Sequence, residues 1–168
     1  GLEYEFVDPV EIIHFTTAGR FDGEETWAAM RKRLRGVERA VIPGFYGSTP
    51  DGRVKTFSRG GSDVTGSIVA RGVDAEVYEN WTDVSGMLMA DPRIVENPKP
   101  IDVVTYRELR ELSYMGATVL HDEAVFPVRE AGIPVQIRNT NAPDDVGTMI
   151  VKMSDRIATE AGTITGIA

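Results

Sequence analysis

The chain has 168 residues, of which 42% are hydrophobic and 26% charged, and this composition is typical of a globular domain. Its net charge of −8 argues against binding to a nucleic-acid backbone, because proteins that do so concentrate Lys and Arg. The lack of cysteine excludes disulfides and thiolate metal sites and fits a reducing compartment, so we expect a cytoplasmic protein. No apolar run approaches the ~18–20 residues of a membrane helix, so we expect no membrane partner.

The N-terminal half of the chain begins with GLEYEF, which contains no Met and no secretory signal, so we expect that the chain begins within a longer protein or has been cut. Apolar residues at helical spacing predict a first helix over 24–35. A short strand is predicted over 39–43, and the glycines of the following GFYGS mark a sharp turn at its end. A second helix is predicted to end near Gly72.

The middle of the chain continues this alternation of strands and helices, which predicts an α/β layered domain. Residues 75–81 are predicted to form a strand. Three prolines within nine residues indicate that 87–102 is an ordered loop rather than a helix or strand. A helix is predicted over 105–114, because Thr105 and Glu108 have the spacing of a capping box.

The last part of the chain predicts one more helix and two strands. The helix spans 122–131, and Pro127 within it predicts a kink or a late start. Gly132 is the expected C-cap. A strand is predicted over 133–139, and residues 141–151 are predicted to be a loop followed by an edge strand.

Arg59-Gly60-Gly61-Ser62-Asp63 is the first candidate site, between a strand-like segment and a helix. Its glycines let backbone N–H groups face a ligand, and Ser62 or Asp63 can cap the helix, whose N-terminus favours anions. Arg59 can grip a carboxylate or phosphate in a bidentate manner. Asp63 suits a ligand that also carries an amine or a metal. The alternative is an ordinary capped helix after a glycine turn.

Thr82 and Asp83 are the second candidate site, because they follow a strand, and ligands of open α/β sheets bind outside the carboxyl ends of strands. Such a pair can hold ribose hydroxyls, a base edge or Mg²⁺-bound water, and the alternative is an ordinary Asx-type turn. The third candidate is Asp91-Pro92-Arg93, for which the alternative is a surface ion pair. The two histidines, His14 and His121, lack metal-ligand spacing. No dinucleotide fingerprint, Walker sequence or nucleophile elbow is present.

Four runs of the sequence, in register from about residue 40 to 151, resemble the aspartokinase family. They are GFYGSTPDGRVKTFSRGGSD, WTDVSGMLMADPRIV, ELSYMGATVLH and IPVQIRNTNAPDDVGT. The resemblance implies the amino acid kinase (carbamate kinase-like) fold, a three-layer α/β/α sandwich, present here in part. It also implies that 1–152 belong to the catalytic domain, mainly its nucleotide-binding half. Residues 153–168 would be a linker and the start of an ACT regulatory domain.

The same resemblance implies ATP-dependent phosphorylation of the β-carboxylate of L-aspartate to 4-phospho-L-aspartate, the first step of lysine, threonine and methionine biosynthesis. Mg²⁺ would arrive with ATP rather than on protein ligands, and a homo-oligomer is expected. The positions that match the family's aspartate site are Phe45, Arg59, Gly60, Gly61, Ser62 and Asp63, with Arg59 and Asp63 as the catalytic pair. The positions that match its nucleotide site are Thr82, Asp83, Leu88, Arg93, Thr118 and Val119.

The sequence departs from the family pattern at three places. The family's opening Lys-Phe-Gly-Gly segment does not occur in these 168 residues, so we expect the chain alone to be inactive. Thr118 replaces a common lysine, whose charge Lys55 or Lys99 would have to supply. Leu88 replaces a common tyrosine near the nucleotide.

Two other functions compete with this interpretation. One is a catalytically inactive nucleotide-binding or assembly module with the kinase fold. The other is a sister kinase acting on another acid, such as acetylglutamate or glutamate. All kinase interpretations require the glycine turn at 59–63 and the Thr82-Asp83 corner to face one ligand cleft.

Overall fold

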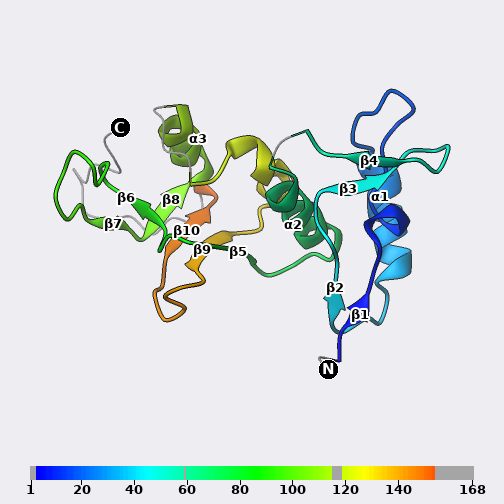
Figure 1. The fold of residues 1–168 in the computed structure, drawn as a ribbon, viewed down its shortest axis with the longest axis horizontal. Coiled ribbons are helices and arrows are strands. Elements are labelled where there is room, and N and C mark those ends of the chain that lie inside the picture. The colour runs from blue at the N-terminus through cyan, green and yellow to red at the C-terminus, as the bar shows by residue number, and fades with distance from the viewer. Residues whose placement is uncertain (1–2, 59, 115–118, 154–168) are drawn as a thin grey trace. The chain divides into compact units, whose positions relative to one another are not determined.

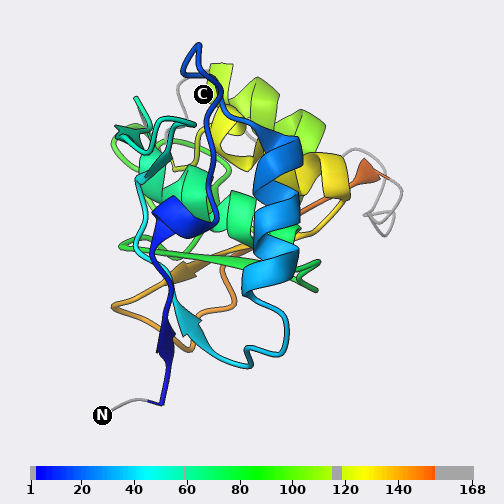
Figure 2. The same ribbon diagram turned by 90° about the vertical axis from the view of Figure 1, so that its right-hand side faces the viewer.

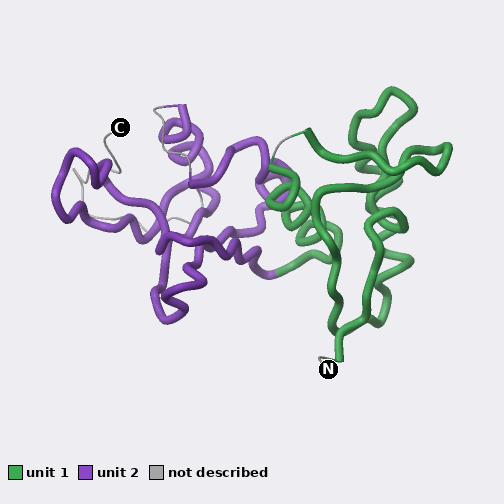
Figure 3. Tube along the Cα trace, in the orientation of Figure 1, with its two compact units in different colours: residues 1–75 green, residues 76–168 purple. Residues whose placement is uncertain are grey.

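The computed structural model describes residues 3–58, 60–114 and 119–153. Helices and strands alternate along the chain, which confirms the α/β class (Figure 1). They form two compact units, called unit 1 (Gly1–Ala75) and unit 2 (Glu76–Ala168) below (Figure 3). No helix within the described ranges is long and apolar enough to cross a membrane.

Unit 1 combines two small sheets with two long helices. Its elements are β1 (Glu5–Phe6), the 3₁₀ helix η1 (Pro9–Glu11), α1 (Gly23–Arg33), β2 (Ala40–Val41), β3 (Tyr46–Ser48), β4 (Val54–Thr56) and α2 (Gly61–Gly72). Strands β1 and β2 pair in parallel, and β3 and β4 pair antiparallel. The two long helices pack on each other (Figure 2).

The sequence around α1 explains where this helix begins and ends. The Asp22 side chain accepts a hydrogen bond from the Glu25 N–H at 3.1 Å, and so caps the first turn. Acidic residues lie in the first turn and basic residues in the last, which matches the helix dipole. Met30 is fully buried and joins a core with Ile13 and Ile68. Burying each such side chain contributes about 1.5–3 kcal/mol. The helix predicted over 24–35 is therefore confirmed.

Unit 2 is built on a four-stranded mixed sheet in the order β5-β9-β10-β8. Its elements are β5 (Tyr78–Thr82), β6 (Met87–Leu88), β7 (Pro100–Ile101), β8 (Val103–Thr105), α3 (Tyr106–Tyr114), η2 (Asp122–Val125), α4 (Phe126–Ala131), β9 (Val135–Asn139) and β10 (Thr148–Val151). β5 and β9 are parallel, while β10 runs antiparallel to β9 and parallel to β8. The carboxyl ends of β5 and β9 therefore share one edge of the sheet.

The helices of unit 2 begin where the sequence predicts. The Thr105 N–H donates to Glu108 Oε2 at 2.8 Å and the Glu108 N–H donates to Thr105 Oγ1 at 3.2 Å, which confirms the capping box. Pro127 lies in the first turn of α4, after the 3₁₀ helix η2, so the late start is confirmed. Gly132 has φ +74° and caps the end of α4. Helix α3 packs on β8 and β10.

Four expectations about strands need correction. The predicted strand 75–81 begins only at Tyr78. Strand β10 lies between β9 and β8 and is not an edge strand. The expected loop 87–102 is closed by the short antiparallel pair of β6 and β7. The expected turn GFYGS contains strand β3. Residues 154–168, which include the expected start of a regulatory domain, lie outside the described residues.

Candidate functional site

The first candidate region lies in unit 1, at the start of α2. Gly60 occupies the N-cap position with φ +56°, and the Val64 N–H donates to its carbonyl at 2.9 Å. The expectation that Ser62 or Asp63 caps the helix is wrong, because both lie in the first helical turn. A glycine at the cap adopts the left-handed conformation without strain, and it leaves the space in front of the helix free of a side chain.

Phe45 is joined to this helix start by a short hydrogen-bond chain. Its N–H donates to Thr65 Oγ1 at 2.9 Å, and the same hydroxyl donates to the Gly61 carbonyl at 2.6 Å. Phe45 has φ +90°, an uncommon conformation for a residue with a side chain. Its ring covers Gly61, where an added Cβ would lie 2.5 Å from Phe45 Cδ2. Only glycine at this position therefore allows the ring to lie on the helix.

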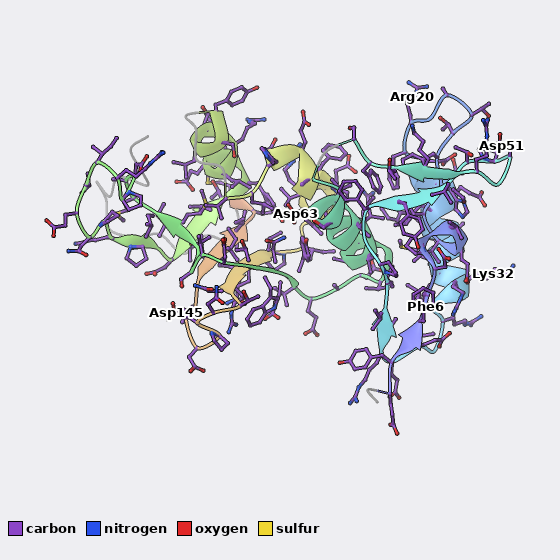
Figure 4. The ribbon with its side chains drawn as sticks, viewed as in Figure 1. Phe6, Arg20, Lys32, Asp51, Asp63 and Asp145 are labelled. Carbon is purple, nitrogen blue, oxygen red and sulfur yellow. The ribbon has the colours of Figure 1, made fainter. Side chains whose placement is uncertain are left out.

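Five of the six expected aspartate-site positions gather in this region. Phe45 and Ser62 are exposed, Gly60 and Asp63 are partly buried, and Gly61 is buried. Asp63 projects from α2 (Figure 4). The sixth position, Arg59, lies outside the described residues.

The second candidate region lies in unit 2, at the carboxyl edge of β5 and β9. Thr82 and Asn139 are the last residues of these strands and pair with each other. The Thr82 carbonyl accepts hydrogen bonds from both the N–H and the hydroxyl of Thr140, at 2.8 and 2.9 Å. The Thr82 hydroxyl donates to Asp83 Oδ1 at 3.3 Å, and Asp83 is exposed. The edge of the sheet thus presents a hydroxyl and a carboxylate to solvent.

The loop after Asp83 is held by side chains that the sequence did not single out. Asn139 Nδ2 donates to Ser85 Oγ at 2.8 Å, and Ser85 Oγ donates to Asp145 Oδ2 at 2.5 Å. At the end of the loop, the Met87 N–H donates to Thr148 Oγ1 at 2.7 Å. The polar run Asn-Thr-Asn, which begins at the last residue of the strand predicted over 133–139, is the signal that could have identified Asn139.

The remaining nucleotide-site positions are more scattered within unit 2. Leu88 lies on β6, opposite Pro100, and is exposed. Val119 is partly buried, and Thr118 lies outside the described residues. Among the described residues no group of three His, Cys, Asp or Glu side chains could hold a metal ion.

Arg93 forms the surface ion pair that the sequence left open as an alternative. Its Nη2 lies 2.6 Å from Asp91 Oδ2, and its side chain is 87% exposed. Hydrogen bonds from Arg93 lower the pKa of the Asp91 carboxyl, and the same contact raises the pKa of Arg93. Both groups therefore stay charged at neutral pH.

The two lysines considered as substitutes for the missing family lysine lie in different units. Lys55 is on β4 in unit 1, with its Nζ 5.9 Å from the centre of the Phe15 ring. Lys99 is exposed in unit 2, beside β7. The two candidate regions also belong to different units, so the shared cleft remains a prediction.

Comparison with known proteins finds a family whose model matches most of the chain. The model of the Amino acid kinase family matches residues 9–139. Aspartokinase 3 of Bacillus subtilis is 46% identical over 171 residues, an alignment that covers 100% of this chain and 37% of the relative. The chain thus spans little more than a third of that relative's length.

Solved structures agree with this match. The aspartate kinase of Clostridium acetobutylicum superposes with a TM-score of 0.92 at 59% identity, over 96% of this chain and 37% of the other. Aspartokinase III of Escherichia coli, in complex with aspartate and ADP, gives a TM-score of 0.80 at 28% identity, over 89% of this chain and 35% of the other. The expected fold class is confirmed.

Proposed function

Because the chain belongs to the amino acid kinase family, we propose that it is part of an enzyme that phosphorylates the β-carboxylate of L-aspartate with ATP. The product is 4-phospho-L-aspartate. The observation that carries this proposal is the similarity to a relative whose structure contains aspartate and ADP, with a TM-score of 0.80. The identity of 46% to another aspartokinase supports the same substrate class.

On the nucleotide side, Thr82 and Asp83 contact the nucleotide at the carboxyl edge of β5 and β9. This location is where α/β sheets bind ligands, because loops after parallel strands open outward there. Arg93 binds a phosphate, and its exposed guanidinium can reorient from Asp91 toward an anion. The other nucleotide contacts come from Leu88, Thr118 and Val119.

On the amino acid side, the N-terminus of α2 and Arg59 bind carboxylate oxygens of aspartate. The twelve-residue helix begins at Gly61, and the dipole at its N-terminus favours an anion. The Asp63 carboxylate balances the positive charge of the substrate's amino group, and the Phe45 ring forms one wall of the site. The backbone at Gly60, Gly61 and Ser62 can approach the ligand closely, since Gly60 adds no side chain.

Phosphoryl transfer to a carboxylate needs in-line positioning and charge stabilisation rather than covalent help from the protein. Mg²⁺ would neutralise phosphate charge when bound, and among the described residues no three His, Cys, Asp or Glu side chains gather as a metal site. This donor set fits an ion held chiefly by phosphate oxygens, which is the usual arrangement for Mg²⁺. The chain's own task is therefore to bind and orient the two substrates.

The proposal extends to the organisation of the protein. Residues 1–152 form part of the catalytic domain, and 153–168 lead into a regulatory domain of the ACT type. The assembly is a homo-oligomer.

Two measurements test this function. Calorimetric titration of the chain with Mg-ATP should give a saturable heat at one site, whereas an assembly module without a nucleotide site would give none. The full-length protein should release ADP when L-aspartate is added, and much more slowly with glutamate or N-acetylglutamate. ADP release driven only by N-acetylglutamate would identify a sister kinase and overturn the proposed substrate.

A further inference from the structure

We propose that Ser85 and Asp145 are positioning residues for the nucleotide corner formed by Thr82 and Asp83. This inference rests on the proposed function, and it assigns a role to two residues outside the expected site. Neither Ser85 nor Asp145 touches the nucleotide. They fix the loop that carries Asp83.

The position of Asp145 is itself fixed by strand β9. The loop 140–147 follows β9, and two β9 side chains hold its backbone: Gln136 Nε2 donates to the Val146 carbonyl at 2.8 Å, and Arg138 Nη2 donates to the Pro143 carbonyl at 2.6 Å. Asp145 lies in this loop, between β9 and β10 (Figure 4). The backbone that carries the Asp145 carboxylate is therefore fixed by these two side chains.

The close return of the loop onto β9 depends on Gly147. This residue has φ +73°, and a Cβ there would overlap the carbonyl oxygen of Ile137. Only glycine allows both the conformation and the approach. The loop that carries Asp145 is thus anchored at its end as well as along its length.

The donor and the acceptor of each hydrogen bond around Ser85 follow from the chemistry of the three side chains. The Asp145 carboxylate only accepts, so the single hydrogen of the Ser85 hydroxyl goes to it. The Ser85 oxygen then accepts from Asn139 Nδ2, which leaves Asn139 Oδ1 to accept from the Asn141 N–H at 2.9 Å. Removing the Ser85 hydroxyl breaks this chain at its centre, and removing the Asp145 carboxylate removes its last acceptor.

Ser85 is the middle anchor of the loop between Asp83 and Met87. The first anchor is the Thr82 carbonyl, held by Thr140, and the last is the Met87 N–H, held by Thr148. Asp83 lies between the first anchor and Ser85, and it is exposed. Without the middle anchor its carboxylate would sample several positions, and a ligand would have to order it on binding.

The test compares Mg-ADP affinity, measured by calorimetry, in variants of the chain. Asp145→Ala should weaken binding about fivefold, the effect of one lost hydrogen bond that orders a site, and Ser85→Ala should weaken it at least as much, because it also removes the bond from Asn139. Asp144→Ala is the matched control, because it removes the same charge one residue earlier and leaves the bond to Ser85 in place. Ser85→Thr keeps the hydroxyl and should bind within about twofold of the wild type.

The double variant Ser85→Ala, Asp145→Ala separates positioning from general destabilisation. Because the Asp145 carboxylate acts through its hydrogen bond to Ser85, the double variant should bind no more weakly than Ser85→Ala alone. Equal affinities for Asp145→Ala and Asp144→Ala, or fully additive losses in the double variant, would overturn the inference. A wild-type chain that binds no Mg-ADP would instead overturn the proposed nucleotide site, and the inference with it.

Discussion

The two candidate regions of this protein are held in place by different means. In unit 1, Phe45 and the start of α2 are joined through Thr65, a side chain with only 3% of its surface exposed. In unit 2, the Thr82-Asp83 corner is held by Ser85, Asn139 and other polar side chains near the surface. Buried hydrogen bonds are costly to lose, whereas bonds near the surface are readily replaced by water. Changes to the Thr65 link in unit 1 should therefore affect folding, and changes to Ser85 or Asp145 in unit 2 should affect mainly the ligand site.

An exception in unit 2 sharpens this comparison and gives the largest expected effect. Gly86 has φ +102°, and a Cβ there would overlap Thr148 Oγ1 and lie 2.7 Å from the Thr148 backbone nitrogen. Gly86→Ala should reduce the free energy of unfolding of unit 2 by roughly 3 kcal/mol, through backbone strain and overlap. Urea unfolding followed by Trp81 fluorescence, in a Trp27→Phe background, measures this. Gly52→Ala in unit 1, followed by Trp27 fluorescence in a Trp81→Phe background, is the control, since Gly52 also has positive φ but open space around it, and it should cost about 1 kcal/mol.

The buried link in unit 1 gives the next largest effect. Thr65→Val keeps the shape but leaves the Phe45 N–H without its acceptor and removes the side-chain hydrogen bond to the Gly61 carbonyl, and should cost about 2 kcal/mol. Urea unfolding followed by Trp27 fluorescence, in a Trp81→Phe background, measures the loss. Thr56→Val, at an exposed position on β4, should change stability by less than about 0.5 kcal/mol. Equal stabilities of the two variants would show that the buried link does not hold the region.

The core of unit 2 should respond to alkaline pH through Tyr106. Its hydroxyl donates to the Ile133 carbonyl at 2.5 Å, and burial raises its pKa. Because the folded pKa exceeds the unfolded value, the contribution of Tyr106 is fully present below about pH 10 and is lost as pH rises through the folded pKa.

Tyr106→Phe should therefore cost about 1 kcal/mol at neutral pH, and its unfolding free energy should fall less steeply above pH 10. Thermal or urea unfolding at pH 7 measures the loss at neutral pH, and the same experiment between pH 8 and 11 measures the slope. This range brackets the ordinary tyrosine pKa of about 10. Tyr114→Phe is the control, because Tyr114 is 83% exposed. Parallel pH profiles for the wild type and Tyr106→Phe would contradict the assignment.

The smallest expected effect on stability is at Arg93. Its ion pair with Asp91 is exposed, so Arg93→Ala should change the unfolding free energy by less than about 0.5 kcal/mol. The affinity of the Arg93→Ala variant for Mg-ADP should nevertheless fall about fivefold, because a phosphate contact is removed. Unchanged affinity in calorimetry would remove Arg93 from the nucleotide site. Arg110→Ala, at an exposed position on α3, controls for the lost charge.

The local parts of the fold could be predicted from the sequence. The capping box at Thr105, the C-cap at Gly132 and the start of α1 each depend on residues within a few positions of one another. Strand pairing could not be predicted in this way. β10 lies inside the sheet because it pairs with β8, more than forty residues earlier, and the local pattern of β10 does not contain that information.

The same limit applies to the candidate site. Glycines and polar residues near Gly60 and Thr82 marked both regions, because turns and strand ends have local signatures. The residues that hold those regions were missed: Thr65 bonds to Phe45 twenty positions away, and Ser85 bonds to Asp145 sixty positions away. Side chains that act as anchors carry no signature of their own, since a serine or aspartate in a turn is common.

Line broadening in NMR spectra of the chain, with paramagnetic Mn²⁺-ADP in place of Mg-ADP, tests the nucleotide site most directly. We expect the amide signals of residues 82–86 and 139–141 to broaden first, because these residues surround the carboxyl edge of β5 and β9. Broadening should be weaker with Asp83→Ala. Broadening that leaves these residues unaffected and appears at 23–33 on α1 would contradict the account.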